Sequence, residues 1–185
     1  CMLLAAASIA MSDADILLLD DFSRSDGRSA LGTDWRAFTD RVMGGVSEMD
    51  ARLVDTDRGP ALRIAGPVRL ENNGGFIQAR LSLAEQGTLD ASRFDAVRIV
   101  LRGRPGAYFL HLRTPQTRRP WQYYRAELSV DETWQERTIP FDAFAGKSIG
   151  GAPDFSRLRS LAVVAYGEAF DAEVEVARLE LVASE

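Results

Sequence analysis

Short runs of alternating apolar and polar residues fill this chain, and no segment spaces its apolar residues as a helix would over three turns. In residues 97–102, Val97, Ile99 and Leu101 fall on one side of an extended strand, and Arg98 and Arg102 fall on the other. Turn residues, including two Gly-Pro pairs, separate the runs. Strands are expected at 16–20, 35–38, 46–54, 61–64, 68–70, 76–83, 96–102, 108–114, 122–130, 135–139, 160–166 and 173–181, and one-turn helices at 90–94 and 141–144.

So many short strands, with no repeat and no linker in 185 residues, predict one all-β domain, a β-sandwich or jelly roll. The last strand is expected to contain a bulge near Ala177, because its apolar alternation slips there. Cys1 is the only cysteine, which excludes an internal disulfide and a cysteine-based zinc site. The fold must therefore be stabilised by packing, and Trp35 and Trp134 are expected to anchor its core.

The net charge of −5 and the isoelectric point near 5.0 argue against a general nucleic-acid-binding role. A local basic patch remains at 113–125.

Residues 1–11 are small and apolar, and they are too short a run to span a bilayer as a helix. Residues 1–14 are therefore interpreted as the remnant of a signal or leader segment, or as a loose terminus, with the domain at 15–185. A lipid-bearing Cys1 is an alternative, and the compartment stays open between export and cytoplasm.

Two glycine doublets mark the tightest expected turns of the chain. Asp40-Arg41-Val42-Met43-Gly44-Gly45-Val46-Ser47 follows an aromatic strand, and Asn72-Asn73-Gly74-Gly75-Phe76 repeats the device. In a structural interpretation, Asp40 caps its turn, Met43 packs, and Arg41 pairs with a carboxylate. In a functional one, Arg41, Met43 and the second turn form the rim of a recognition surface, since glycines let a ligand approach the backbone and Met adapts to irregular partners.

These two segments, in this order, resemble the complex I intermediate-associated protein family, the thirty-kilodalton class. Later features resemble it too, namely Phe94-Asp95 before a strand, Trp134-Gln135, residues 139–144, and Tyr166-Gly167 followed by Phe170. The resemblance covers residues 20–181. It implies a jelly-roll sandwich similar to galactose-binding-like domains and some carbohydrate-binding modules. It also implies a role in protein assembly, because the family's mitochondrial member assists assembly of respiratory NADH:ubiquinone oxidoreductase.

The sequence offers little for catalysis. His111 is the only histidine, and no nucleophile-elbow motif accompanies it, so it is interpreted as a sheet-face residue that packs or touches a ligand. Trp121, Tyr123 and Tyr124 stand among arginines that include Arg113, a composition suited to stacking on a sugar ring or gripping a protein. No cofactor is expected. A structural calcium between the first and last strands is a minor alternative, from Asp20, Asp21, Glu173, Glu175 and Glu180.

The leading hypothesis is a non-catalytic binding module acting in protein assembly, with respiratory-complex subunits or assembly factors as partners. The alternative is a carbohydrate-binding module of the bacterial cell envelope, and a hydrolase is the least favoured. No nucleic acid and no transmembrane span are expected. The residues expected to bind the ligand or partner are Asp40, Arg41, Met43, Gly44, Gly45, Asn72, Asn73, Gly74, Gly75, His111, Arg113, Trp121, Tyr123 and Tyr124.

Overall fold

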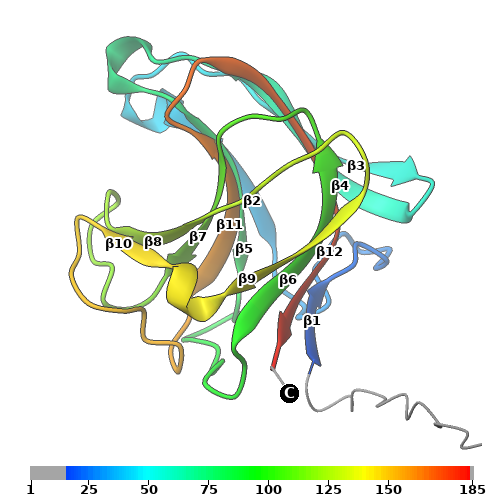
Figure 1. The fold of residues 1–185 in the computed structure, drawn as a ribbon, viewed down its shortest axis with the longest axis vertical. Coiled ribbons are helices and arrows are strands. Elements are labelled where there is room, and N and C mark those ends of the chain that lie inside the picture. Colours follow the sequence, from blue (N-terminus) through cyan, green and yellow to red (C-terminus); the bar gives the residue numbers. More distant parts are fainter. Residues whose placement is uncertain (1–15, 184–185) are drawn as a thin grey trace, which may run out of the picture.

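Two antiparallel sheets face each other across one core in the computed structural model, which describes residues 16–183 (Figure 1). The first sheet has the order β3-β4-β12-β6-β9, with β1 also paired to β12, and the second has the order β10-β8-β7-β11-β5-β2. The strands are β1 (Ile16–Asp20), β2 (Trp35–Thr39), β3 (Asp50–Thr56), β4 (Gly59–Val68), β5 (Phe76–Ser82), β6 (Ala96–Gly103), β7 (Tyr108–Arg113), β8 (Tyr123–Glu127), β9 (Gln135–Pro140), β10 (Ala145–Lys147), β11 (Ser160–Tyr166) and β12 (Phe170–Val182). The all-β sandwich prediction is confirmed, whereas the leader expected at 1–14 lies outside the described residues.

Strand alternation places the core as expected. Val97, Ile99 and Leu101 of β6 are fully buried, while Arg98 and Arg102 lie half-buried on the outer face of the first sheet. The register of β12 against β6 shifts between Val176 and Arg178, which confirms the bulge near Ala177. The core is therefore a layer of mainly aliphatic side chains from the inner face of each sheet, joined by aromatic ones such as Tyr124 and Phe94.

The sequence prediction was wrong around the second Gly-Pro pair. Residues 61–64 and 68–70 were expected to form two strands, but β4 runs through Gly66 and Pro67 without a break. The Pro67 carbonyl accepts a hydrogen bond from the Glu48 N–H at 3.2 Å, so the proline nitrogen also points away from β12. On that side Pro67 has no strand partner, because β3 begins only at Asp50. The N–H that proline lacks therefore removes no hydrogen bond from the β3–β4 ladder. The expected strand at 46–54 is accordingly shorter and begins at Asp50.

The short helices were only partly predicted. A 3-10 turn forms at Phe141–Ala143, close to the expected 141–144. No helix forms at 90–94, where Leu89 instead makes a β-bridge with Leu158. Two further 3-10 turns, η2 (Asp40–Met43) and η3 (Glu71–Asn73), occupy the glycine segments.

One buried carboxylate joins the two glycine segments. Asp40, which is fully buried, accepts hydrogen bonds from the Ser47 N–H (2.9 Å), the Ser47 hydroxyl (2.5 Å) and the Gly75 N–H (2.6 Å). A Cβ added to Gly45 would lie 2.3 Å from Asp40 Cγ, and one on Gly74 would lie 2.4 Å from its Oδ2. The expectation that Asp40 caps its turn is confirmed, and Gly45 and Gly74 are required by close approach to this side chain.

Replacing Asp40 by Asn should lower the free energy of unfolding by about 2–4 kcal/mol, because the Asn amide would face backbone donors in a buried site. Burial raises the pKa of Asp40, but the hydrogen bonds from Ser47, Gly75 and Phe76 outweigh it and hold the pKa below 3.8. The wild-type advantage should therefore be complete above pH 3.8 and shrink as the pH falls through the lowered pKa. Urea unfolding at several pH values measures this.

Gly74→Ala should destabilise the protein in the same assay, since its Cβ would collide with the Asp40 carboxylate. Gly150→Ala is the matched control, because nothing lies within 4 Å of its added Cβ. Equal stabilities of the two variants would contradict the role given to Asp40.

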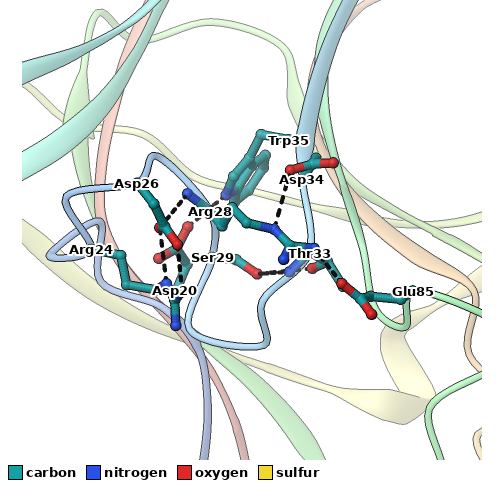
Figure 2. A network of polar contacts seen from close by, with 9 residues as sticks. All are labelled: Asp20, Arg24, Asp26, Arg28, Ser29, Thr33, Asp34, Trp35 and Glu85. Carbon is teal, nitrogen blue, oxygen red and sulfur yellow. Dashed lines mark hydrogen bonds and ion pairs between the residues drawn. The ribbon is translucent and has the colours of Figure 1, made fainter.

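A second polar network holds the loop between β1 and β2, as Figure 2 shows. Trp35 Nε1 donates to Asp20 Oδ2 at 2.7 Å, and the Phe22 N–H donates to Asp20 Oδ1 at 2.9 Å. Burial raises the pKa of Asp20 in spite of these bonds.

Trp35 packs against the core as expected. Trp134 does not, because it lies at the surface under the Arg102 guanidinium, 4.6 Å from its ring centroid.

Candidate binding site

A groove of about 630 Å³ crosses the outer face of the second sheet. In β5, the inward-facing Ile77, Ala79 and Leu81 are buried in the core, so Phe76, Gln78 and Arg80 project outward. The same alternation turns the outer residues of β7, β8 and β11 to this face. The groove is lined by Phe38, Val42, Met43, Phe76, Gln78, Arg80, His111, Arg113, Pro120, Trp121, Tyr123, Lys147, Ser148, Val164 and Tyr166.

Stacked rings form the floor of this groove. The His111 and Tyr123 rings lie parallel, with centroids 4.1 Å apart, and Tyr166 meets His111 edge-on at 6.2 Å. His111 is only 8% exposed, and its Nε2 has no hydrogen-bond partner among the described residues. Burial, together with the Tyr166 hydroxyl, raises the pKa of Tyr123, so its phenol is neutral at physiological pH. The floor is therefore aromatic and uncharged, with one polar atom left without a partner.

Trp121 forms one wall of the groove from the loop that precedes β8. It is 59% exposed, although large apolar side chains are usually buried. The Arg113 guanidinium donates to the carbonyl oxygens of Arg119 and Pro120 and thereby fixes the loop that carries Trp121. The Gln122 side chain adds a bond to the Ser148 carbonyl at 3.1 Å. The loop that carries this exposed indole is consequently fixed both to the sheet, through Arg113, and to the segment that follows β10, through Gln122.

The opposite end of the groove is apolar. Val42 and Met43 of η2 are 72% and 60% exposed, and Phe38 of β2 lies beside them in the lining. The structural interpretation, in which Met43 packs, is wrong, because the side chain is 60% exposed and lies at this rim. Arg41 pairs with Glu48 at 2.9 Å, as the structural interpretation expected, but both side chains are largely exposed, so the pair contributes little stability.

The groove brings together some of the residues nominated from the sequence and separates others. Met43, His111, Arg113, Trp121 and Tyr123 line it. Tyr124, in contrast, is fully buried in the core between the sheets and faces away from the groove, which corrects its proposed ligand contact. The two glycine turns contact each other, since Asn72 Nδ2 donates to the Gly44 carbonyl at 3.2 Å. The binding role expected for these turns, from Asp40, Arg41, Gly44, Gly45, Asn72, Asn73, Gly74 and Gly75, stays a prediction, as the groove lining contains none of them.

Sequence reasoning missed the contribution of β5 and β11. Phe76, Gln78 and Arg80 from β5, with Val164 and Tyr166 from β11, complete the lining between η2 and β7. The alternation of β5 was visible in the sequence and predicts an outward row. The position of β5 within the sheet could not be predicted, because β11 lies between β5 and β7 and pairs with both, and these three strands are not consecutive in the chain.

The carboxylates considered for calcium have other partners. Glu180 contacts Arg98 at 2.6 Å and also Arg178, and Glu175 contacts Arg102 at 2.7 Å. Within residues 16–183, no cluster of three or more His, Cys, Asp or Glu side chains is arranged to hold a metal ion. These carboxylates act as ion-pair partners on the outer face of the first sheet.

The family model described as complex I intermediate-associated protein 30 matches residues 21–167 of this chain. The chain belongs to the complex I intermediate-associated protein 30 family. None of the curated protein sequences matches it. In this member of the family, no helix within the described part of the chain is long and apolar enough to cross a membrane.

Several solved structures with the same fold are carbohydrate-binding modules. The family 11 module of cellulosomal cellulase Lic26A-Cel5E of Clostridium thermocellum has a TM-score of 0.72 at 14% identity, covering 91% of this chain and 95% of that one. The family 11 module from the same organism in complex with a β-1,3-1,4-mixed-linked tetrasaccharide gives 0.70 at 14%, covering 92% and 96%. The family 30 module of its cellulase Cel9D-Cel44B gives 0.61 at 16%, covering 82% and 92%. At these identities the likeness establishes the fold of this family member and nothing more.

His111 provides a direct probe of the groove floor in this family member, because it is the only histidine in the chain. Burial lowers its pKa to about 3, helped by the charges of Arg125, Arg113 and Arg80. Its ring should stay neutral from pH 8 to pH 5 in an NMR titration. Since an unfolded histidine takes up a proton near pH 6.5, stability should fall as the pH drops from 6.5 towards 3.

Arg125→Gln should raise the pKa of His111 part of the way to its ordinary value, because burial remains the larger cause. Arg157→Gln removes an equal charge elsewhere and should leave the titration unchanged. A wild-type midpoint near 6.5 would show that His111 is solvated and would contradict this description of the floor.

Proposed function

We propose that this chain is a non-catalytic binding module and that a saccharide chain lies in the groove across the second sheet. The observation that carries this proposal is the side chain of Trp121, 59% exposed and fixed at the groove wall by the loop bonds of Arg113 and Gln122. An exposed aromatic ring on a fixed loop offers a flat apolar surface to the face of a sugar ring at small entropic cost. The groove volume of about 630 Å³ suits a ligand of several rings.

The fold comparison supports the same proposal. One of the similar structures is a module in complex with a mixed-linked tetrasaccharide, on a sandwich that matches this one over almost all of its length. The binding face here has the features such a ligand uses, with rings to stack against and polar groups at Gln78, Ser148 and His111 to fix its orientation.

The lining of the groove also explains why binding without cleavage is proposed. Hydrolysis of a glycosidic bond by the usual route needs two carboxyl groups that flank it, one as acid and one as base or nucleophile. No Asp or Glu lines the groove in the described structure. Its single histidine has a pKa of about 3 and is a poor general base near neutral pH.

Trp121→Ala should weaken saccharide binding about thirtyfold, since truncating an aromatic anchor of a contact costs about 2 kcal/mol. Trp134→Ala is the matched control, because that indole lies at the edge of the other sheet against Arg102. Both variants should keep the wild-type melting temperature within a few degrees. A glycan array followed by calorimetry measures the effect, and equal binding by wild type and Trp121→Ala would contradict the groove as the site.

A second candidate function is protein assembly, which family membership and the exposed pair Val42–Met43 favour. Adjacent apolar side chains with such high exposure are typical of protein contacts. The partner would be a respiratory-complex subunit or another assembly factor, and η2 would be its contact.

Met43→Glu should then abolish recovery of a specific partner from cell extracts without lowering the melting temperature, because Met43 is 60% exposed and packs on little. Glu48→Lys alters charge beside the same turn but outside the groove lining, and serves as its control. Identical partner recovery by Met43→Glu and wild type would exclude η2 as the contact.

A further inference from the structure

The two outer faces of the sandwich differ in whether their arginines form ion pairs with carboxylates. On the first sheet, Arg98 pairs with Glu180, Arg102 with Glu175 and Arg63 with Glu173. Each of these arginines therefore has its charge balanced by a carboxylate on the neighbouring strand, β12. That face presents little net charge to an incoming ligand.

The groove on the second sheet contains cations without such partners. Arg80, Arg113 and Lys147 line it, and within the described residues no carboxylate forms an ion pair with any of the three. The Arg80 guanidinium lies over the Phe38 ring, 4.6 Å from its centroid, and Arg113 donates to backbone carbonyls. The nearby Glu127, at the end of β8, lines a separate hollow with Arg125.

The environment of these groups supports a positive potential in the groove. Burial, with the charge of Arg113, lowers the pKa of Arg80 to about 10, so the guanidinium remains protonated at neutral pH although half-buried. The pKa of His111 is lowered first by burial and then by three arginines, Arg125, Arg113 and Arg80. The neutral His111 ring adds no charge to the groove floor, so the sign of the potential there is set by the arginines and Lys147. A hollow with low-dielectric aromatic walls focuses such a field.

The cations are spread along the groove. Arg80 is on β5 and Lys147 is on β10, four strand spacings apart in the order β10-β8-β7-β11-β5. At roughly 4.8 Å per spacing, this is about 19 Å measured along the sheet. Arg113 on β7 lies between them. A ligand that meets all three must carry repeated negative charges along its length.

We infer that the groove takes an acidic saccharide chain, one that carries carboxylate or sulfate groups at intervals along its rings. The inference rests on the proposed function and adds the class of sugar to it. Trp121 would stack on a ring while Arg80, Arg113 and Lys147 meet successive acidic groups, Arg80 with the planar fork that suits an oxyanion. Because the whole protein carries a net charge of −5, a polyanion gains no general attraction from it and must bind through this groove.

Matched ligands separate the acidic group from the sugar. Calorimetry compares a galacturonate oligosaccharide with its methyl ester, and a sulfated galactan oligosaccharide with its desulfated form. At least one acidic ligand should bind about tenfold or more tightly than its neutral counterpart, and which pair differs identifies carboxylate or sulfate as the group recognised. The affinity should fall as salt is added.

Arg80→Gln and Lys147→Gln should each lower the affinity for the acidic ligand about tenfold, and should lower the affinity for the neutral counterpart by much less. Arg58→Gln makes the same charge change in the turn between β3 and β4 of the other sheet, and should have no effect. Lys147 is exposed, so Lys147→Gln keeps the test valid if Arg80→Gln fails to fold.

The outcomes distinguish the inference from the proposed function. Trp121-dependent binding of the neutral and acidic ligands with equal affinity would overturn the acidic class while leaving saccharide binding in place. Binding of no saccharide would overturn both. Trp121-dependent binding of an acidic peptide, with no saccharide bound, would likewise overturn both and would favour a protein partner.

Discussion

The central strands of the second sheet, β5, β7 and β11, each have one face committed to the core, and this constraint determines what the other face can do. Their inner residues are almost wholly buried and, apart from Tyr108, aliphatic, so the apolar surface that this sheet buries in the core lies on that side. The outer residues do not take part in packing the core between the sheets. On β5, β7 and β8 they include arginine, histidine and tyrosine, residues that a core would accept only with full hydrogen bonding. The outer face can therefore carry an aromatic and cationic groove without disturbing the core.

The glycine segments, which dominate the sequence, support this surface indirectly. Asp40 accepts hydrogen bonds from both segments, and its carboxylate takes the space that a side chain at Gly45 or Gly74 would need. The result is a fixed 3-10 turn whose exposed Val42 and Met43 end at the groove rim. The conformation of this segment is thus set by a buried carboxylate, and the part of it that lines the groove is Val42 and Met43, two of the three residues between Asp40 and Gly44.

The sequence predicted the fold well and the site in part, for physical reasons. Alternation determines which residues of a strand share a face, so the strands, the core of β6 and the bulge at Ala177 followed from local pattern. Tyr123, His111 and Arg113 were found in the same way, because β7 and β8 are adjacent in both chain and sheet. Arg80 on β5 and Tyr166 on β11 were missed because long-range strand pairing brings them to the site. β5 pairs with β11, and the two segments lie about 80 residues apart in the chain. Tyr124 was misassigned because composition alone does not tell which of two neighbouring tyrosines faces inward.

The contrast between the two outer faces argues that the groove's charge is selected by a ligand and not by folding. On the first sheet, pairing Arg98, Arg102 and Arg63 with glutamates removes the cost of placing guanidiniums side by side. On the second sheet, Arg80 stays half-buried without an anion and is further disfavoured by Arg113. Such an arrangement lowers stability unless something else supplies the negative charge. The protein is acidic, yet none of its described carboxylates lines this aromatic-walled groove. The space next to the groove's cations is therefore open to an acidic group of another molecule.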